Sequence, residues 1–182
     1  VNYQFESSDS NLTTLPDAVL KQLPAMETDK VEYGKTAQPS KNSFGDVIDT
    51  ENDGRWTFKG WTPEKVENVT SDVEFVGTWE FIPNKHKVTY KFESAETDKK
   101  LPEAITRQLP KEEEHVKGDQ VTAPALKNDV ISVEDGVWKF EGWNPKNITV
   151  DTEDIAITGK WSFEAHKHIV SYEFKSSSDK EL

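Results

Sequence analysis

The sequence of 182 residues contains no cysteine. Disulfides, thiol nucleophiles, thioesters and cysteine-based zinc sites are therefore excluded. No apolar run approaches the roughly eighteen residues that would span a bilayer, and no signal-peptide core is present. Hydrophobic residues make up only 34%, which is lean for one large globule but adequate for small domains with concentrated aromatic cores. Because the chain begins at Val1 without a methionine, we expect an internal segment of a longer protein.

Basic residues are also scarce relative to acidic ones. The chain has 22 lysines and arginines against 34 aspartates and glutamates, for a formal charge of −12. The negative charge is spread along the chain and would repel nucleic acid and anionic membranes, so neither is expected as a partner. A well-solvated surface explains this charge.

The chain consists of repeats, as its recurring motifs show. A V-x-Y-x-F strand motif occurs three times, while an L-P-(x6)-L-P motif, an Asp-Gly followed by W-x-F-x-G-W, and a final G-x-W-x-F each occur twice. The three copies of the first motif begin at Val1, Val88 and Val170. We therefore predict a first repeat at residues 1–85, a second at 86–167, and the opening strand of a third at 168–182.

Each repeat reads as a small α+β unit. The V-x-Y-x-F motif alternates apolar and polar residues and predicts a half-buried strand. Leu15, Val19 and Leu23 lie four apart on one helical face, between prolines that suit the start and the end of a helix of about two turns. Asp53-Gly54 between apolar runs predicts a hairpin tip. Nine alternating residues ending at Phe81 predict the longest strand.

All six tryptophans fall at three recurring positions. They are Trp56 with Trp138, Trp61 with Trp143, and Trp79 with Trp161. Four of them are in phase with the apolar residues of their strands, which favours a core over a sugar-binding platform on the solvent face. Trp61 and Trp143 follow a glycine at a strand end and remain the candidates for a binding surface. Three rings per unit, each removing roughly 150–250 Å² from water, would hold about 80 residues together.

The four histidines are candidate metal ligands. His166 and His168 form an H-x-H pair, and His86 occupies the position equivalent to His168. No third ligand completes a zinc site, so we expect exposed junction residues and no bound metal. His115 belongs to no such pattern.

Two acidic stretches resemble functional sites only in part. Residues 49–54 resemble the start of a calcium loop, but Gly60 stands where the bidentate glutamate is needed, so we predict a hairpin tip. Glu112, Glu113 and Glu114 read as a solvated loop. The motifs of serine hydrolases, zinc proteases and nucleotide-binding loops are missing. We expect no enzymatic activity, no catalytic, cofactor-binding or metal-binding residues, and no cofactor.

Cysteine-free surface domains sometimes carry Lys–Asn isopeptide bonds, which need a lysine pointing into the core. The recurring lysines lie in loop or junction sequence, so nothing supports such a bond. They are Lys41 with Lys127, and Lys85 with Lys167.

Taken together, these motifs resemble the SHIRT domain, a streptococcal repeat found in tandem on cell-wall-anchored surface proteins. The resemblance covers both repeats and the start of a third, and it extends to other Gram-positive surface repeats of β-grasp type. It implies an antiparallel, β-grasp-like sheet with one short helix in each unit, arranged head to tail. It also implies a stalk that holds a separate binding domain away from the cell wall, and it brings no catalytic or ligand residues.

The junctions favour the same function. Residues 82–87 and 164–169 connect the last strand of one repeat to the first strand of the next, and neither is rich in glycine or serine. We expect a monomeric, extracellular rod that extends by roughly 40–50 Å per repeat, with neighbouring repeats and a distal adhesin domain as its partners. The alternative is an adhesive module that itself binds host glycan or protein through Trp61, Trp143 or the exposed faces.

Overall fold

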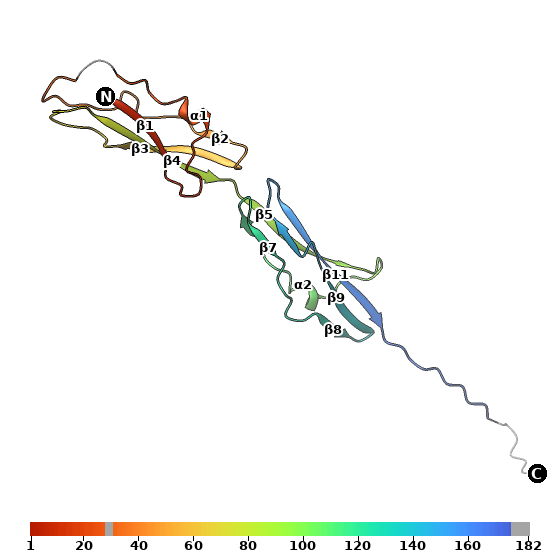
Figure 1. The fold of residues 1–182 in the computed structure, drawn as a ribbon. Helices are drawn as coiled ribbons and strands as arrows, with labels where there is room; N and C mark the ends of the chain where they lie inside the picture. The colour runs from red at the N-terminus through yellow and green to blue at the C-terminus, as the bar shows by residue number, and fades with distance from the viewer. Residues whose placement is uncertain (28–30, 176–182) are drawn as a thin grey trace, which may run out of the picture. The chain divides into compact units, whose positions relative to one another are not determined.

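The computed structural model describes residues 1–27 and 31–175, which form two compact units. Of the described residues, unit 1 comprises those within 1–87, 114–120 and 149–154, and unit 2 comprises 88–113, 121–148 and 155–175. Each unit is β-rich with a single short helix, as the sequence predicted (Figure 1).

Unit 1 is built on a four-stranded sheet. Its elements are β1 (Asn2–Ser7), α1 (Asp17–Leu20), β2 (Val47–Asp49), β3 (Gly54–Thr62) and β4 (Glu74–Pro83), with the strand order β1-β4-β3-β2. The predicted hairpin is present, because β2 and β3 pair antiparallel on either side of Asp53. β4 is the longest strand of the unit, as expected.

The five-stranded sheet of the second repeat has the order β6-β5-β11-β9-β8. Its strands are β5 (His86–Ser94), β6 (Glu113–His115), β8 (Val130–Val133), β9 (Gly136–Asn144) and β11 (Ile155–Ala165). The helix α2 (Glu103–Thr106) follows β5, and β7 (Gln120–Thr122) pairs with β10 (Asn147–Thr149) in a separate two-stranded sheet.

The sheets are mixed, which corrects the expectation of antiparallel sheets. β1 pairs with β4 in parallel, and β5 pairs with β11 in parallel. A parallel pair needs a long crossover connection, and the helix and hairpin of each repeat supply it. An alternating strand pattern does not encode the direction of its neighbour.

The helices are shorter than the two predicted turns. α1 and α2 have four residues each, and each buries one side chain completely, Val19 and Ile105. After α1 the backbone hydrogen bonds span three residues instead of four: Gln22 N donates to Val19 O, and Leu23 N donates to Leu20 O. Such three-residue spacing replaces the second α-helical turn before Pro24.

The smaller strands were not predicted. The segment Glu112–Glu114, expected to be a solvated loop, contributes to β6, which lies beside β5. The third copy of the strand motif is not a strand in the described residues 170–175, and its apolar side chains are exposed. A strand needs a neighbour to accept its backbone hydrogen bonds, and no strand among the described residues pairs with 170–175. Residues 176–182 of the predicted third repeat lie outside the described residues.

Candidate functional site: aromatic cores and Asp–Gly turns

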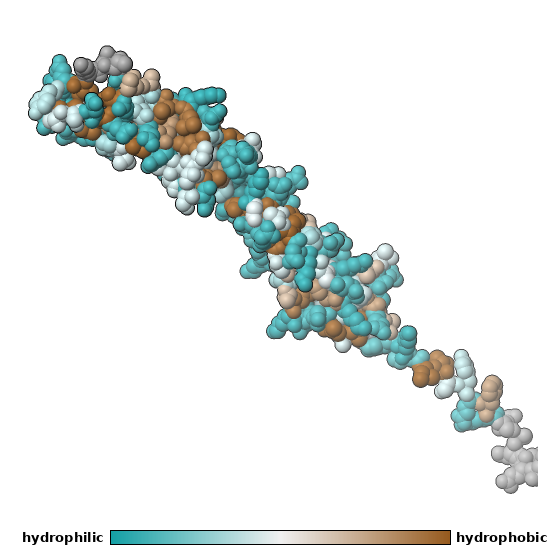
Figure 2. Space-filling view, viewed as in Figure 1, coloured by the Kyte–Doolittle hydropathy of each residue, from teal (hydrophilic) through white to brown (hydrophobic). Residues whose placement is uncertain are grey.

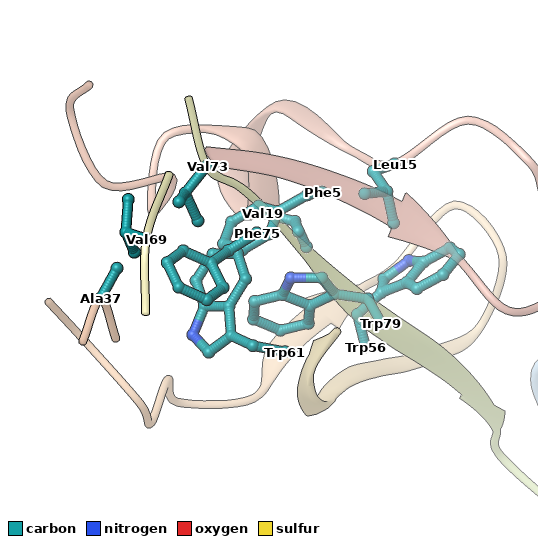
Figure 3. Close-up of a cluster of buried hydrophobic side chains, with 10 residues drawn as sticks. All are labelled: Phe5, Leu15, Val19, Ala37, Trp56, Trp61, Val69, Val73, Phe75 and Trp79. Carbon is teal, nitrogen blue, oxygen red and sulfur yellow. The ribbon is translucent and has the colours of Figure 1, made fainter. Parts of the chain in front are cut away.

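The tryptophans form the centre of each unit. In unit 1, Trp56 and Trp79 are fully buried and Trp61 is 6% exposed. Figure 3 shows the three indoles below β1, in one cluster with Phe5, Phe75 and Val19. In the second repeat Trp161 is fully buried and Trp138 is 3% exposed. The interpretation of these rings as core is confirmed.

Trp61 and Trp143, the candidates for a glycan surface, also face inward. Trp61 stacks on Phe5 with ring centroids 5.5 Å apart, and its indole N–H donates to Lys41 O at 2.7 Å. Trp143 stacks on Phe92 at 5.2 Å and donates to Pro124 O at 2.8 Å. Trp143 is only half-buried, so of the two it offers more ring to solvent.

Glycines make room for these rings. A Cβ at Gly77 would lie 2.8 Å from the rings of both Phe5 and Phe58. A Cβ at Gly159 would lie 2.7 Å from Trp143 and 2.9 Å from Phe92. The glycine of the G-x-W-x-F motif is therefore needed because aromatic rings sit directly on the backbone of β4 and β11.

The Asp–Gly turn of unit 1 is held by Asp49. Its carboxylate accepts hydrogen bonds from the Trp56 indole N–H and from the backbone and side-chain N–H groups of Asn52, each at 2.9 Å. Burial opposes the charge of Asp49, but the bonds from Asn52 and Trp56 outweigh it and lower the pKa of this carboxyl. Asp49 is the first residue of the stretch that resembles a calcium loop, and its carboxylate stabilises the hairpin by these hydrogen bonds.

The same turn contains a buried contact between a histidine and a carboxylate. His86 Nε2 approaches Asp53 Oδ2, and Asn84 donates to Asp53 through its side chain and its backbone, both at 2.8 Å. The hydrogen bond from His86, followed by that from Asn84, lowers the pKa of Asp53. His86 is 9% exposed, which corrects the expectation of an exposed residue. The repeat pattern predicted that His86 lies just before a strand, but nothing in the sequence predicted its contact with Asp53.

The turn of the second repeat differs. Asp135 is exposed and pairs with Lys99 at 2.9 Å, and the hydrogen bond from Lys99 lowers its pKa. His166 N donates to Asp135 O, as Asn84 N does to Asp53 O. His166 and His168 are exposed, as predicted. His115 Nδ1 lies 3.3 Å from Asp119.

The recurring lysines lie outside the strands. Lys41 Nζ sits 4.3 Å above the Phe44 ring, and Lys41, Lys127, Lys85 and Lys167 are all exposed. An isopeptide bond would require one of them to point into the core, and none does.

One open hollow of about 510 Å³ lies at the end of unit 1 where the chain starts. Its walls include Val1, Met26, Tyr33, Val69 and Val73. Its lining residues include no histidine and two carboxylates, Glu27 and Asp72, and Glu27 accepts a hydrogen bond from Tyr3 at 2.7 Å. Across residues 1–27 and 31–175, no three histidine, aspartate or glutamate side chains gather as metal ligands would. The same residues contain no helix of sufficient length and apolarity to cross a membrane.

Comparison with known proteins identifies the repeats. The family model described as "SHIRT domain" matches residues 1–82 and 84–164. The chain is similar to a solved structure of "Streptococcal High Identity Repeats in Tandem (SHIRT) domains 3-4 from cell surface protein", with 29% identity and a TM-score of 0.69 over 91% of this chain and 98% of that one. SHIRT domain 10 from a streptococcal cell surface protein also matches, at 29% identity and a TM-score of 0.42, over 44% of this chain and 99% of that one. No curated protein matches significantly.

Proposed function

Because the chain belongs to the SHIRT domain family, we propose that it is a spacer within a cell-surface protein of a Gram-positive bacterium. In this role its two repeats, 1–85 and 86–167, follow one another head to tail as β-grasp-like units, with a third beginning at 168. The repeats extend a monomeric, extracellular stalk that carries a distal adhesin domain. Anchoring to the cell wall is supplied by a region outside this chain.

The observation that carries the proposal is the short connection between repeats. β4 ends at Pro83 and β5 begins at His86, so only Asn84 and Lys85 separate the two strands. Asn84 is itself bonded to Asp53. A connection of two residues without glycine or serine lacks the composition of a flexible linker, which supports the proposal. At about 3.3 Å per residue, the ten residues of β4 alone span roughly 33 Å.

The surface and interior support a spacer more than a catalyst. The tryptophans are used in the cores, and the visible face of each unit is mainly hydrophilic, with small hydrophobic patches (Figure 2). Asp49 and Asp53, the carboxylates most enclosed by the fold, are bonded to neighbouring side chains. The proposal includes no enzymatic activity and no cofactor.

Small-angle X-ray scattering tests the extended arrangement. A compact globule of 182 residues would have a radius of gyration of about 16 Å, and we expect a clearly larger value with a maximum dimension of about 80–100 Å for two repeats. A chain ending at residue 167 serves as the control, because it removes the contribution of the C-terminal segment. A globular value for both chains would contradict the proposal.

The alternative function, adhesion through the repeats themselves, is tested by binding. A glycan array and tryptophan fluorescence titrations would be run on the wild type and on Trp143→Ala, the recurring tryptophan with most exposure. We expect no saturable binding. Saturable binding that is lost in a folded Trp143→Ala variant would favour the adhesive role.

A further inference from the structure

The first and last strands of each repeat pair in parallel, and this pairing determines how the repeat resists unfolding by a pulling force. In unit 1, β1 and β4 pair over six consecutive positions, from Asn2 with Glu74 to Ser7 with Trp79. Asn2 N donates to Val73 O and Ser8 N to Trp79 O, both at 2.8 Å, so the ladder is bonded at both ends. The second repeat has the same arrangement, with β5 and β11 paired over seven positions from Val88 with Ile155 to Ser94 with Trp161.

Because these strands are parallel, the chain enters and leaves at opposite ends of the ladder. Tension between the two ends of a repeat pulls β1 by its first residue, Asn2, and β4 by its last residue, Pro83. The two strands are pulled in opposite directions and must slide along one another. Hydrogen bonds of a parallel pair are evenly spaced, and sliding stretches all of them together. A hairpin pulled open from its end would instead lose its bonds one at a time.

The side chains oppose the same sliding movement. The Phe5 ring lies against Gly77, where a Cβ would be 2.8 Å away, and Phe75 and Trp79 flank that glycine on the same face of β4. If β1 moves toward its start, Phe5 must pass the Phe75 ring. In the second repeat Phe92 lies against Gly159, between Ile157 and Trp161.

We infer that each repeat is a mechanical clamp, a unit that resists unfolding under tension along the chain through its β1–β4 or β5–β11 ladder. This function goes beyond spacing and does not depend on it, since a spacer needs only length. The direction of the force is decisive, because the same bonds would yield more easily if the ladder were opened from one end.

Single-molecule force spectroscopy in two pulling directions tests the clamp. One handle is placed at the N-terminus in both cases, and the second is placed either at the C-terminus or on Asp72→Cys, an exposed position beside the start of β1. The lack of native cysteine makes that handle unique. Pulling from Asp72 opens the ladder from one end and should extend the chain by about 240 Å on unfolding.

We expect unit 1 to unfold at a clearly higher force when pulled between the chain ends than when pulled from residue 72 at the same speed. Equal forces, or a higher force from residue 72, would overturn the inference. This comparison uses folded protein with an unaltered ladder.

A pair of variants gives an independent measure. Gln4→Pro removes a backbone N–H from the middle of β1, in the phase that faces β4. Val19→Ala removes buried side-chain atoms of α1 and deletes no backbone N–H of the β1–β4 ladder. For each variant, the drop in the unfolding force of unit 1 is divided by the loss of equilibrium stability. This ratio should be larger for Gln4→Pro than for Val19→Ala. The second repeat should keep its wild-type unfolding force and serves as an internal reference. Equal ratios would contradict the clamp. If Gln4→Pro does not fold, the two pulling directions alone decide.

Discussion

His86 and Asp53 are joined by a buried bond in which His86 Nε2 lies 2.5 Å from a carboxylate oxygen of Asp53, although 33 positions separate the two residues. The bond connects the first residue of β5 to the turn between β2 and β3. Asp53 has a positive φ of 56°, a conformation that aspartate and asparagine tolerate better than most residues. The turn therefore places the Asp53 carboxylate beside the first residue of β5.

This pair should make the stability of unit 1 depend on pH. The pKa of Asp53 is lowered in the folded state, so its stabilising contribution is present above the ordinary pKa of an aspartate, 3.8, and is lost as the pH falls through the lowered pKa. Asp53→Asn, which keeps the turn conformation accessible, should be less stable than the wild type at neutral pH. The two stability curves should converge in acid, as measured by urea unfolding at a series of pH values.

Asp135→Asn is the matched control for this experiment. Asp135 holds the same place in the second repeat, but its side chain is 66% exposed and it pairs with Lys99 at the surface. Exposed pairs contribute little, so this variant should lose less stability than Asp53→Asn. A gap between Asp53→Asn and the wild type that stays constant into acid would rule out the titration of Asp53 as its cause.

Removal of a buried indole should destabilise one repeat selectively. Trp79 is fully buried among Phe5, Phe44 and Phe58, and Trp79→Ala should cost unit 1 about 3–5 kcal/mol. Ile48→Ala, at a side chain that is 70% exposed, should change stability by no more than about 0.5 kcal/mol. Denaturant melts would measure both, and a loss below about 1 kcal/mol for Trp79→Ala would mean that the ring is not structural.

The indole N–H of Trp56 should matter more than that of its counterpart Trp138. Trp56→Phe leaves the Asp49 carboxylate without one of its donors and should cost about 1–3 kcal/mol. In the second repeat Val133 pairs with Gly136 as Asp49 pairs with Gly54, and it offers no carboxylate. Trp138→Phe should therefore cost less. Equal losses in chemical unfolding would show that the Asp49 bond contributes little.

Glycine at position 77 should be required for packing. Gly77→Ala places a methyl group against two aromatic rings and should destabilise unit 1 by about 1–3 kcal/mol. Gly45→Ala is the control, since a Cβ there meets nothing within 4 Å. Thermal unfolding of both variants would separate a local clash from a general effect of replacing glycine. A neutral Gly77→Ala variant would mean that Phe5 and Phe58 move aside without cost.

The amino-acid sequence by itself determined the repeats, the Asp–Gly hairpin and the inward orientation of four tryptophans, whereas the packing of Trp61 and Trp143 was decided by the structure. These features depend on local rules: alternation places Trp56 and Trp79 on one face of their strands, and Asp-Gly adopts the backbone of a tight turn. The SHIRT family followed from the same motifs, and the match over both repeats confirms it.

Only the tertiary structure decided which strands are neighbours and in which direction they run. The parallel pairing of β1 with β4 joins residues more than seventy positions apart, and no alternating pattern specifies it. The same holds for the burial of His86, which depends on Asp53 arriving from the other side of the β2–β3 turn. Contacts between distant segments arise from the way the whole chain buries its apolar surface. Short motifs therefore predict the individual strands and turns, but they do not determine which strands pair with one another.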